Sequence, residues 1–286
     1  MTCRKQNLRY HEQQSAQAIN ISKLPSLADK ERLEVPLYNF DFYGKIEIGS
    51  KKSAKEVVPI IIELINPKSI IDVGCGVGTW LSVFAEYGVQ DFLGIDGDWV
   101  DKKLLHIPQS AFSFKELTRP LNIGREFDLV VSLEVAEHLP KSSAENFVDS
   151  LTSLGPVVLF SAAIPFQGGT NHVNEQWPNY WVELFSKKGC LVVDAIRQRI
   201  WQNENVESWY AQNILIFVNK SKLKEYPSLS KAYALTKTDQ ISIVHPNLFL
   251  LKVDPHNLST RTVIHMLPTA LKNTFKRKLK KLARKK

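Results

Sequence analysis

Apolar residues gather in seven short runs along the middle of the chain, with more polar stretches of helical spacing between them. The first five runs are apolar on both faces, which is typical of parallel strands that helices cover on each side. The last two are longer and are separated by a polar stretch at 202–209, a pattern that indicates an antiparallel pair at a sheet edge. The seven predicted strands are residues 69–73, 91–95, 111–114, 127–133, 157–162, 190–200 and 214–218.

Two of the intervening stretches carry signals for helix ends. A helix over 54–64 is predicted to begin after Ser53, whose hydroxyl suits the N-cap position. A second helix, over 79–87, is predicted to end at Gly88, because glycine favours the left-handed backbone of a C-terminal cap. Strands that alternate with helices predict an α/β fold: a Rossmann-like, doubly wound, seven-stranded sheet, mostly parallel with one antiparallel edge strand.

The same pattern divides the chain into three parts. Residues 1–45 are polar and irregular, with Pro25 and Pro36 as breakers, and are interpreted as an N-terminal arm that covers a site. Residues 46–220 contain all seven predicted strands and form the predicted α/β domain. Residues 221–286 become polar and then basic, which predicts a C-terminal extension with a basic tail.

Composition is that of an ordinary globular chain with a sizeable core: of 286 residues, 44% are apolar and 23% are charged. No apolar run is long enough to span a membrane, and the first residues lack a signal-type apolar segment, so we expect a cytoplasmic protein. Cys3, Cys75 and Cys190 lack the spacing of a zinc site or a disulfide framework and are expected to be reduced thiols.

Positive charge is confined to the end of the chain. The formal net charge is +8, but residues 272–286 alone contain nine Lys and Arg and no acidic residue. The remainder is therefore close to neutral and lacks the basic footprint of a nucleic-acid-binding domain. A nucleic-acid partner is disfavoured on this ground, and only the tail leaves it open.

An apolar stripe runs through the tail, with members three or four residues apart: Leu267, Leu271, Phe275, Leu279 and Leu282. On a helix whose other positions are basic, this stripe is typical of contact with an anionic membrane surface. The protein would then lie peripherally on the inner face of the membrane. Two other interpretations stay open, namely packing of the stripe on the domain and an arm for nucleic acid.

Three glycines at alternate positions follow the first predicted strand. Gly74, Gly76 and Gly78 allow a tight turn and a close approach of the backbone to a ligand. Asp72 precedes them and can accept a hydrogen bond from a cationic amine. Asp96 ends the next strand, where its carboxylate can accept both hydroxyl hydrogens of a ribose. Together these groups indicate a site for a nucleoside that carries a positive centre.

Residues 70–80 and Asp96 resemble motifs I and II of the class I S-adenosylmethionine-dependent methyltransferases, and 114–117 resembles the next motif, in which an acid meets the adenine amine. The resemblance covers 53–220, and Glu116 stands where most members are expected to carry Asp. S-adenosylmethionine is the implied cofactor, and the residues implied to bind it are Asp72, Gly74, Cys75, Gly76, Gly78, Asp96, Gly97, Glu116, Leu117 and Leu133. The alternative, a Rossmann dehydrogenase, requires a GxGxxG turn, whereas the spacing here is GxGxG.

Three ionisable residues follow the predicted strand at 127–133. If a helical turn starts there, Glu137 and His138 lie three and four positions after Glu134, so that the side chains converge where ligands bind in parallel sheets. His138 is then a candidate general base, with a carboxylate of Glu134 or Glu137 orienting its ring. The same groups also suit Mg²⁺ or Mn²⁺, which could bind a diol and acidify one hydroxyl.

A further ligand for such a metal is available in the loop after the fifth predicted strand, where His172 lies three residues before Glu175. This arrangement resembles the Glu-x-x-Glu-His motif and distant His of metal-dependent O-methyltransferases, some of which act on ribose hydroxyls of small RNAs and on quinone precursors. The implied ligands are Glu134, Glu137, His138 and His172. In the alternative interpretation, these residues brace a loop and bind no metal.

The resemblance to bacterial Glu-His methyltransferases, the diol-binding chemistry and the tail together favour O-methylation of a sugar hydroxyl in a surface glycan or a glycosylated metabolite. The expected partner is therefore a small molecule or a glycan. Two alternatives stay open: methylation of an RNA ribose 2′-hydroxyl, and a non-catalytic, cofactor-binding scaffold that docks on membranes.

Overall fold

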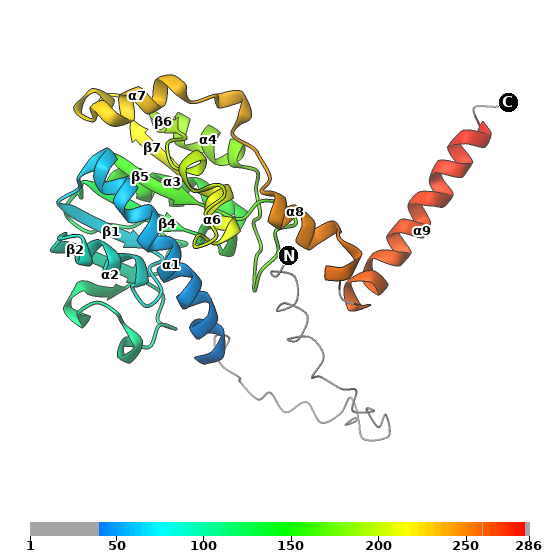
Figure 1. The fold of residues 1–286 in the computed structure, drawn as a ribbon, viewed down its shortest axis with the longest axis horizontal. Coiled ribbons are helices and arrows are strands. Elements are labelled where there is room, and N and C mark those ends of the chain that lie inside the picture. Colours follow the sequence, from blue (N-terminus) through cyan, green and yellow to red (C-terminus); the bar gives the residue numbers. More distant parts are fainter. Residues whose placement is uncertain (1–39, 259, 284–286) are drawn as a thin grey trace, which may run out of the picture. The chain divides into compact units, whose positions relative to one another are not determined.

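The computed structural model describes residues 40–258 and 260–283 (Figure 1). Residues 1–39, most of the predicted N-terminal arm, lie outside the described residues, and residues 40–45 of that arm begin helix α1, Phe40–Ile65. Contacts divide the chain into Met1–Tyr43 and Gly44–Lys286, and the second unit contains the sheet and the candidate site.

Seven strands form one sheet in the order β3-β2-β1-β4-β5-β7-β6. All pairings are parallel except those of β7, which runs antiparallel to both β5 and β6. The predicted fold class is therefore confirmed, and the antiparallel strand belongs to the pair at the edge. The strands are β1 (Ser69–Val73), β2 (Asp91–Asp96), β3 (Phe112–Phe114), β4 (Leu129–Leu133), β5 (Val157–Ser161), β6 (Cys190–Val193) and β7 (Leu215–Asn219).

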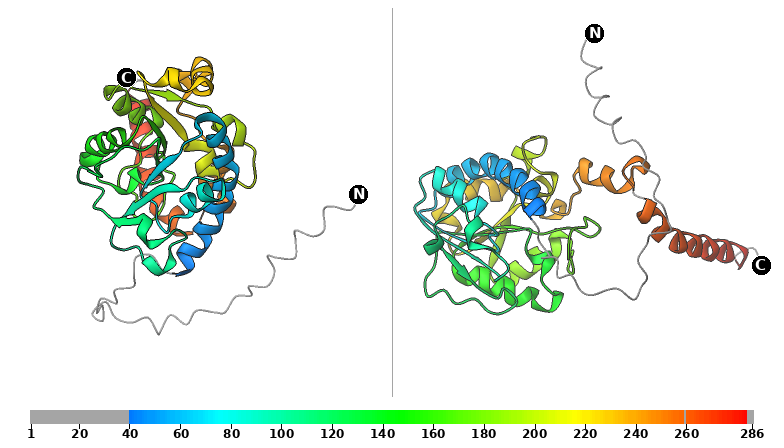
Figure 2. Two further views of the ribbon diagram at one scale, coloured as in Figure 1. Left: turned by 90° about the vertical axis from the view of Figure 1, so that its left-hand side faces the viewer. Right: turned by 90° about the horizontal axis from the view of Figure 1, so that it is seen from below.

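Helices cover both faces of this sheet (Figures 1 and 2). Besides α1, the α-helices of the described residues are α2 (Thr79–Glu86), α3 (Ala144–Leu154), α4 (Pro178–Lys187), α5 (Arg197–Ile200), α6 (Ser208–Asn213), α7 (Pro227–Leu235), α8 (Pro246–Val253) and α9 (Thr260–Ala283), the last of which does not cover the sheet. One apolar cluster joins the sheet to α1 and α2 and includes Ile61 and Leu81. A second cluster joins it to α3 and α4 and includes Phe147 and Phe185. Because both faces are buried, the central strands are apolar throughout.

The predicted start of the first helix is wrong. Helix α1 is already helical at Phe40, and Ser53 lies inside it. The Ser53 hydroxyl donates a hydrogen bond of 2.8 Å to the Gly49 carbonyl, one turn earlier, as serine often does within helices. Its oxygen also accepts from the Glu207 backbone N–H at 3.0 Å, so Ser53 joins the helix to a distant loop instead of capping it.

The predicted length of the sixth strand is also wrong, because β6 ends at Val193 and not at residue 200. The cause is an ion pair in the next turn, where Arg197 donates to both carboxylate oxygens of Asp194 at 2.9 and 2.6 Å. The buried Arg197 side chain also donates to the carbonyls of Gln212 and Ile241. These bonds hold the chain in helix α5 and away from the sheet. No described helix is both long and apolar enough to cross a membrane.

Candidate active site

The glycine turn between β1 and α2 has the backbone that its sequence predicts. Gly74, Gly76 and Gly78 have φ angles of 85°, 54° and 80°, which side chains with a Cβ rarely adopt. The N–H groups of Gly74 and Cys75 donate to the Ile95 carbonyl, which ties the turn to β2. A Cβ placed on Gly76 would meet no described heavy atom within 4 Å. The Gly76 backbone therefore faces open space, where a ligand can approach it closely.

Asp96 closes this turn from the end of β2. One carboxylate oxygen accepts from the Gly76 N–H at 2.7 Å, and the other accepts from the Gly97 N–H at 2.6 Å. Burial raises the pKa of Asp96, and these two bonds with one from the Trp99 side chain act against that rise. Each oxygen can accept a second hydrogen bond, so the carboxylate can still receive the hydroxyls of a ribose.

Asp72 lies at the end of β1 and is almost completely buried. Burial raises its pKa well above the ordinary value, and the charge of Asp96 raises it further. A cation bound beside these two carboxylates would favour their ionised forms and gain from their charge. The pair therefore suits a ligand with a positive centre, in agreement with the chemistry expected from the sequence.

The other predicted cofactor residues differ in what they offer. Cys75 is buried, its sulfur would lie 2.8 Å from a Cβ on Gly94, and its thiol donates to the Gly76 carbonyl at 3.4 Å. Leu117 and Leu133 are buried apolar side chains. Glu116 is exposed, and one of its carboxylate oxygens accepts from both the N–H and the hydroxyl of Thr118, which lowers its pKa.

Trp99 is a residue of this region that the sequence analysis missed. A Cβ placed on Gly97 would lie 2.1 Å from the Trp99 ring, so the indole covers the Gly97 backbone and only glycine fits below it. The ring is still 57% exposed, which is unusual for so large an apolar surface. Its position beside Asp96 makes it a candidate surface for a flat, aromatic part of the ligand.

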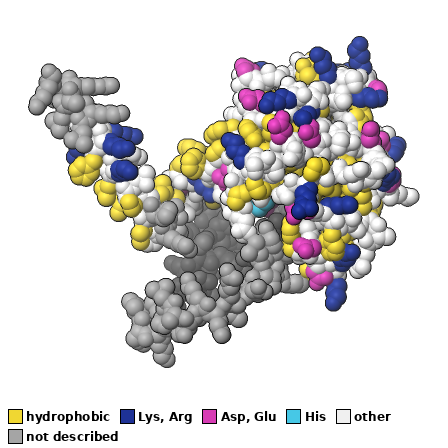
Figure 3. Space-filling view, turned by 180° about the vertical axis from the view of Figure 1, so that it is seen from behind, with side chains coloured by type: hydrophobic (Ala, Val, Ile, Leu, Met, Phe, Trp, Pro, Cys, Tyr) yellow, Lys and Arg dark blue, Asp and Glu magenta, His cyan; other side chains and the backbone are white. Residues whose placement is uncertain are grey.

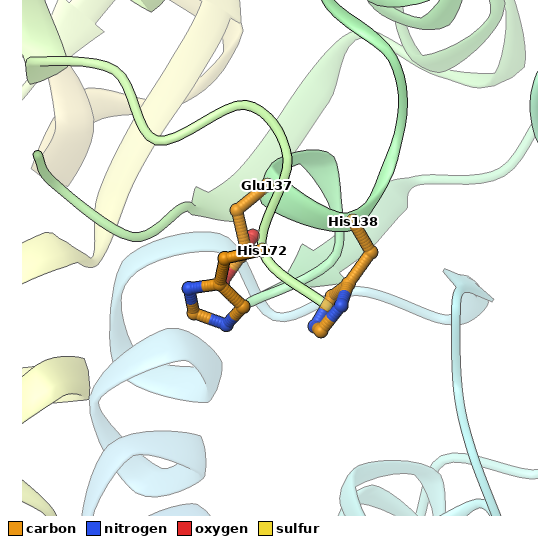
Figure 4. Close-up of side chains that lie close together, drawn as sticks. All are labelled: Glu137, His138 and His172. Atoms are coloured by element: carbon orange, nitrogen blue, oxygen red, sulfur yellow. The ribbon is translucent and has the colours of Figure 1, made fainter. Parts of the chain in front are cut away.

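Glu137, His138 and His172 form a second group of polar side chains (Figure 4). One possible ligand atom from each lies within 4.8 Å of the others, and the two imidazole centroids are 4.8 Å apart. Glu137 and His138 lie on the short 3₁₀ turn Ala136–His138 that follows β4, as predicted. The N–H groups of Val173 and Asn174 donate to the Glu137 carbonyl, and these bonds bring the loop with His172 to the turn.

Several polar atoms of this cluster have no hydrogen-bond partner within the described part of the chain. They are both carboxylate oxygens of Glu137 and Nδ1 of His138, all buried. Buried polar atoms are nearly always paired, so such a concentration points to a group that binds here. Burial raises the pKa of Glu137 well above its usual range, and the charge of Glu134 raises it further.

His138 is neutral over the physiological range, because burial and the charge of His172 lower its pKa to about 4. A neutral imidazole retains a lone pair, which both a general base and a metal ligand require. The second ring differs, because Nδ1 of His172 lies 3.0 Å from a carboxylate oxygen of Glu175 and must donate to it. In the neutral form of that ring, Nε2 carries the lone pair.

Glu134 lies outside this three-residue cluster, unlike the arrangement that the resemblance implied. Its two carboxylate oxygens accept from the side-chain amides of Gln167 and Asn213 at 2.9 and 3.1 Å. Its backbone has a φ of 54°, and its N–H donates to Ser161. Glu134 therefore anchors the end of β4 and acts on the cluster through its charge on Glu137.

Glu175 holds the loop that carries His172, a role that the sequence analysis did not assign. Its carboxylate accepts from the N–H groups of Phe166 and Gly168 at 2.7 and 2.6 Å, in addition to the His172 ring. Phe166 and Asn171 of this loop have φ angles of 70° and 59°, which side chains other than glycine adopt at a cost. The Glu175 carboxylate thus stabilises a strained loop conformation next to the candidate site.

The glycine turn and the polar cluster are neighbours. A Cβ on Gly74 would lie 2.4 Å from Val135, the residue just before the turn with Glu137 and His138. A glycine turn with two buried carboxylates, at the carboxyl edge of a sheet ordered 3-2-1-4-5-7-6, defines a class I methyltransferase. The family model of a methyltransferase domain matches residues 51–209, and the chain belongs to this family. It is an S-adenosylmethionine-dependent methyltransferase.

Solved structures with a similar fold share little sequence with the chain. The magnesium protoporphyrin IX methyltransferase from Synechocystis PCC 6803, solved with S-adenosylhomocysteine, is 19% identical; the match covers 63% of this chain and 88% of that one, with a TM-score of 0.46. A bacterial Hen1 methyltransferase domain is 19% identical over 58% and 98% of the two chains, with a TM-score of 0.43. The amino pentose methyltransferase of calicheamicin biosynthesis from Micromonospora echinaspora is 14% identical over 63% and 98%, with a TM-score of 0.47. No curated protein matches the sequence.

Proposed function

We propose that this methyltransferase transfers the methyl group to a sugar hydroxyl of a surface glycan or a glycosylated metabolite. The observation that carries the proposal is the cluster of Glu137, His138 and His172, whose unpartnered buried atoms lie next to the glycine turn. Methyl transfer to a hydroxyl requires its deprotonation, whereas an amine acceptor carries its own lone pair. A neutral imidazole in a polar cluster meets that requirement.

In this proposal the cofactor lies along the glycine turn. Asp96 accepts hydrogen bonds from the ribose hydroxyls, and Asp72 faces the cationic part. The cofactor approaches the Gly76 backbone closely, because that side of the glycine is open. Cys75 and Gly97 contribute backbone, and Leu117 and Leu133 contribute apolar surface. Glu116 would have to release Thr118 in order to reach the adenine amine, so it contributes least.

His138 takes the proton of the acceptor hydroxyl in the proposed reaction. The oxygen attacks the methyl carbon in line with the carbon–sulfur bond, which breaks as the new carbon–oxygen bond forms and leaves neutral S-adenosylhomocysteine. The electron pair of the broken bond stays on sulfur, and the proton stays on His138 until solvent removes it. Positioning contributes most of the remaining rate enhancement, because the step requires only a close, in-line approach of two bound molecules.

Mg²⁺ or Mn²⁺ fits the same cluster. Both oxygens of Glu137 and Nδ1 of His138 are unpartnered among the described residues, and Nε2 of His172 would offer a lone pair from the neutral ring. These three residues would hold the ion, and Glu134 would contribute its negative charge without direct coordination. A bound divalent cation would supply an acidifying charge for a neighbouring hydroxyl.

A chelation experiment tests this metal proposal. Treatment with EDTA is expected to reduce turnover by roughly 100-fold, the effect of losing several kcal/mol of charge stabilisation, and added Mn²⁺ or Mg²⁺ should restore it. Affinity for S-adenosylmethionine, measured by titration calorimetry, serves as the control and should not change, because the Asp96 site contains no ligand of the ion. Full turnover after chelation would show that the reaction needs no metal ion, and His138 would then be the base by itself.

A panel of acceptors tests the function itself. With methyl-labelled S-adenosylmethionine, label is expected on nucleotide sugars or glycolipids, at an oxygen that mass spectrometry locates on a sugar hydroxyl. Label on short RNA alone, decreasing steeply with salt, would replace the proposal with ribose 2′-O-methylation. Tight cofactor binding with no transfer to sugars, quinols or RNA would indicate a scaffold.

A further inference from the structure

Helix α9 exposes a row of large apolar side chains. Ile264, Leu267, Leu271 and Phe275 are all more than half exposed, with values of 64%, 53%, 52% and 68%. Their spacing of three or four residues places them on one face of the helix. A continuous row of exposed apolar side chains marks a contact surface, whereas single exposed apolar residues are common on any protein surface.

Basic residues border this apolar face. With about 3.6 residues per turn, Lys272 and Lys276 lie to one side of it and Arg277 lies to the other. Figure 3 shows hydrophobic side chains beside Lys and Arg along this end of the described chain. Because residues 272–286 contain nine Lys and Arg and no acid, the complementary surface is anionic. A second copy of the same helix would bring two such charges together, which disfavours self-association.

Helix α8 also exposes large apolar side chains. Its side chains are about half exposed at four positions: Phe249, Leu250, Leu251 and Val253. The start of α8 is attached to the domain through His245, whose N–H donates to the Gln212 side chain at 2.8 Å and whose Nε2 donates to the Trp201 carbonyl at 2.7 Å. The buried His245 side chain thus fixes α8 next to α6.

The attached helix also meets the loop of the candidate site. A Cβ on Gly168 would lie 3.1 Å from Nζ of Lys252 in α8. In the same loop, Phe166 is 85% exposed although the Glu175 carboxylate holds its backbone in a left-handed conformation. A strained backbone that displays an aromatic side chain to solvent suggests a contact that the side chain makes with another surface. The loop with His172 therefore lies next to helix α8.

We propose that α8, α9 and Phe166 form a docking surface for an anionic lipid bilayer. Aliphatic side chains bordered by cations match the apolar interior and charged headgroups of such a bilayer. RNA fits less well, because single strands are bound by aromatic stacking along a basic groove, and aliphatic residues dominate this face. The proposal has a second part that rests on the proposed function: the sugar acceptor is carried on a lipid and reaches His138 at the bilayer surface.

Vesicle cosedimentation of the full chain tests the docking. We expect binding to vesicles of equimolar phosphatidylcholine and phosphatidylserine and little binding to phosphatidylcholine alone. Replacing Lys272, Lys276 and Arg277 with Glu should weaken the partition constant by roughly 100-fold or more. The double variant Leu271→Ser and Phe275→Ser keeps the charges and should weaken it by roughly 10-fold or more. The matched control is Leu235→Ser, which removes an equally apolar, 80% exposed side chain from the end of α7 and should bind as the unaltered chain does.

Each result decides the matter. Equal binding to both vesicle types would overturn the charge complementarity, and full binding by the serine variant would overturn insertion of the apolar face. Binding to short RNA in place of vesicles would assign the tail to nucleic acid. Since cosedimentation needs neither cofactor nor acceptor, failure of the proposed methyl transfer would leave these results unaffected.

A separate experiment tests the lipid-borne acceptor. Methylation of a vesicle-bound glycolipid should fall in the Leu271→Ser, Phe275→Ser variant, while methylation of a soluble sugar analogue should not. An equal effect on both acceptors would overturn this second part.

Discussion

Replacing Asp96 with alanine is expected to lower the affinity for S-adenosylmethionine by about 100-fold or more. The carboxylate accepts hydrogen bonds from the N–H groups of Gly76 and Gly97, and these bonds shape the turn. It is also the proposed acceptor for two ribose hydroxyls. Hydrogen bonds to an ionised group contribute about 1.5–3 kcal/mol each, so loss of the two ribose bonds alone accounts for a change of this size. Titration calorimetry with S-adenosylmethionine measures it.

The control for this experiment lies two residues away. Asp98 is exposed and carries the same charge, so Asp98→Ala removes an identical group without touching the turn and should bind the cofactor normally. The Asp96→Asn variant retains one acceptor oxygen and a similar shape, and we expect an intermediate affinity. An Asp96→Ala variant that is folded, by its thermal unfolding curve, and binds the cofactor as tightly as the unaltered chain would contradict the assignment.

That Asp72, the glycine turn and Asp96 lie close together could be predicted from the sequence, because these residues stand at the ends of neighbouring strands. Asp72 and Gly74 follow one apolar run, and Asp96 ends the next. In a parallel sheet, the carboxyl ends of neighbouring strands meet at one edge, so these groups are brought together by the fold class alone. The Gly76 N–H that donates to Asp96 is an example, since the two residues are 20 positions apart.

The partners of Glu134 could not be predicted in the same way. Gln167 and Asn213 are 33 and 79 residues away, and neither amide belongs to a spacing pattern that indicates a contact. Their position depends on how the loop after β5 and helix α6 pack, which apolar periodicity does not specify. The resemblance implied that Glu134 is a ligand, and the structure adds that its oxygens accept hydrogen bonds from these two amides. The role of Glu175 was missed for a similar reason, because the donors to its carboxylate are backbone N–H groups, which nearly every loop residue possesses.

The predicted end of the sixth strand was wrong because polar side-chain contacts interrupt an apolar run there. The run at 190–200 is apolar enough for a long strand, yet Asp194 and Arg197 form an ion pair within one turn and end β6. Neither residue is unusual by itself, and only the burial of the arginine with its carbonyl acceptors makes the turn favourable. Periodicity thus located the strands, and polar contacts between distant segments set their ends.

Replacing His138 with alanine is expected to reduce turnover by roughly 100-fold or more while cofactor affinity stays nearly unchanged. A positioned general base contributes about that much, and the imidazole makes no hydrogen bond to the glycine turn among the described contacts. The fold should tolerate the change, because Nδ1 of His138 has no partner there to leave behind. Steady-state turnover with labelled cofactor, together with calorimetry, separates the two quantities, and His256→Ala removes an exposed imidazole as the control. Unchanged turnover would remove His138 from the mechanism.

The companion variant His172→Ala then distinguishes the two ways in which the cluster can deprotonate a hydroxyl. If the cluster holds a metal, loss of the Nε2 ligand should reduce turnover about as much as loss of His138, by roughly 10- to 100-fold or more, and added Mn²⁺ should restore part of it. If His138 acts without a metal, His172→Ala removes only a neighbouring charge that lowers the pKa of His138. The base then becomes slightly stronger, and turnover at neutral pH should stay close to that of the unaltered enzyme. A large loss in His172→Ala together with full resistance to EDTA would contradict both mechanisms, because it would make His172 itself the group that takes the proton.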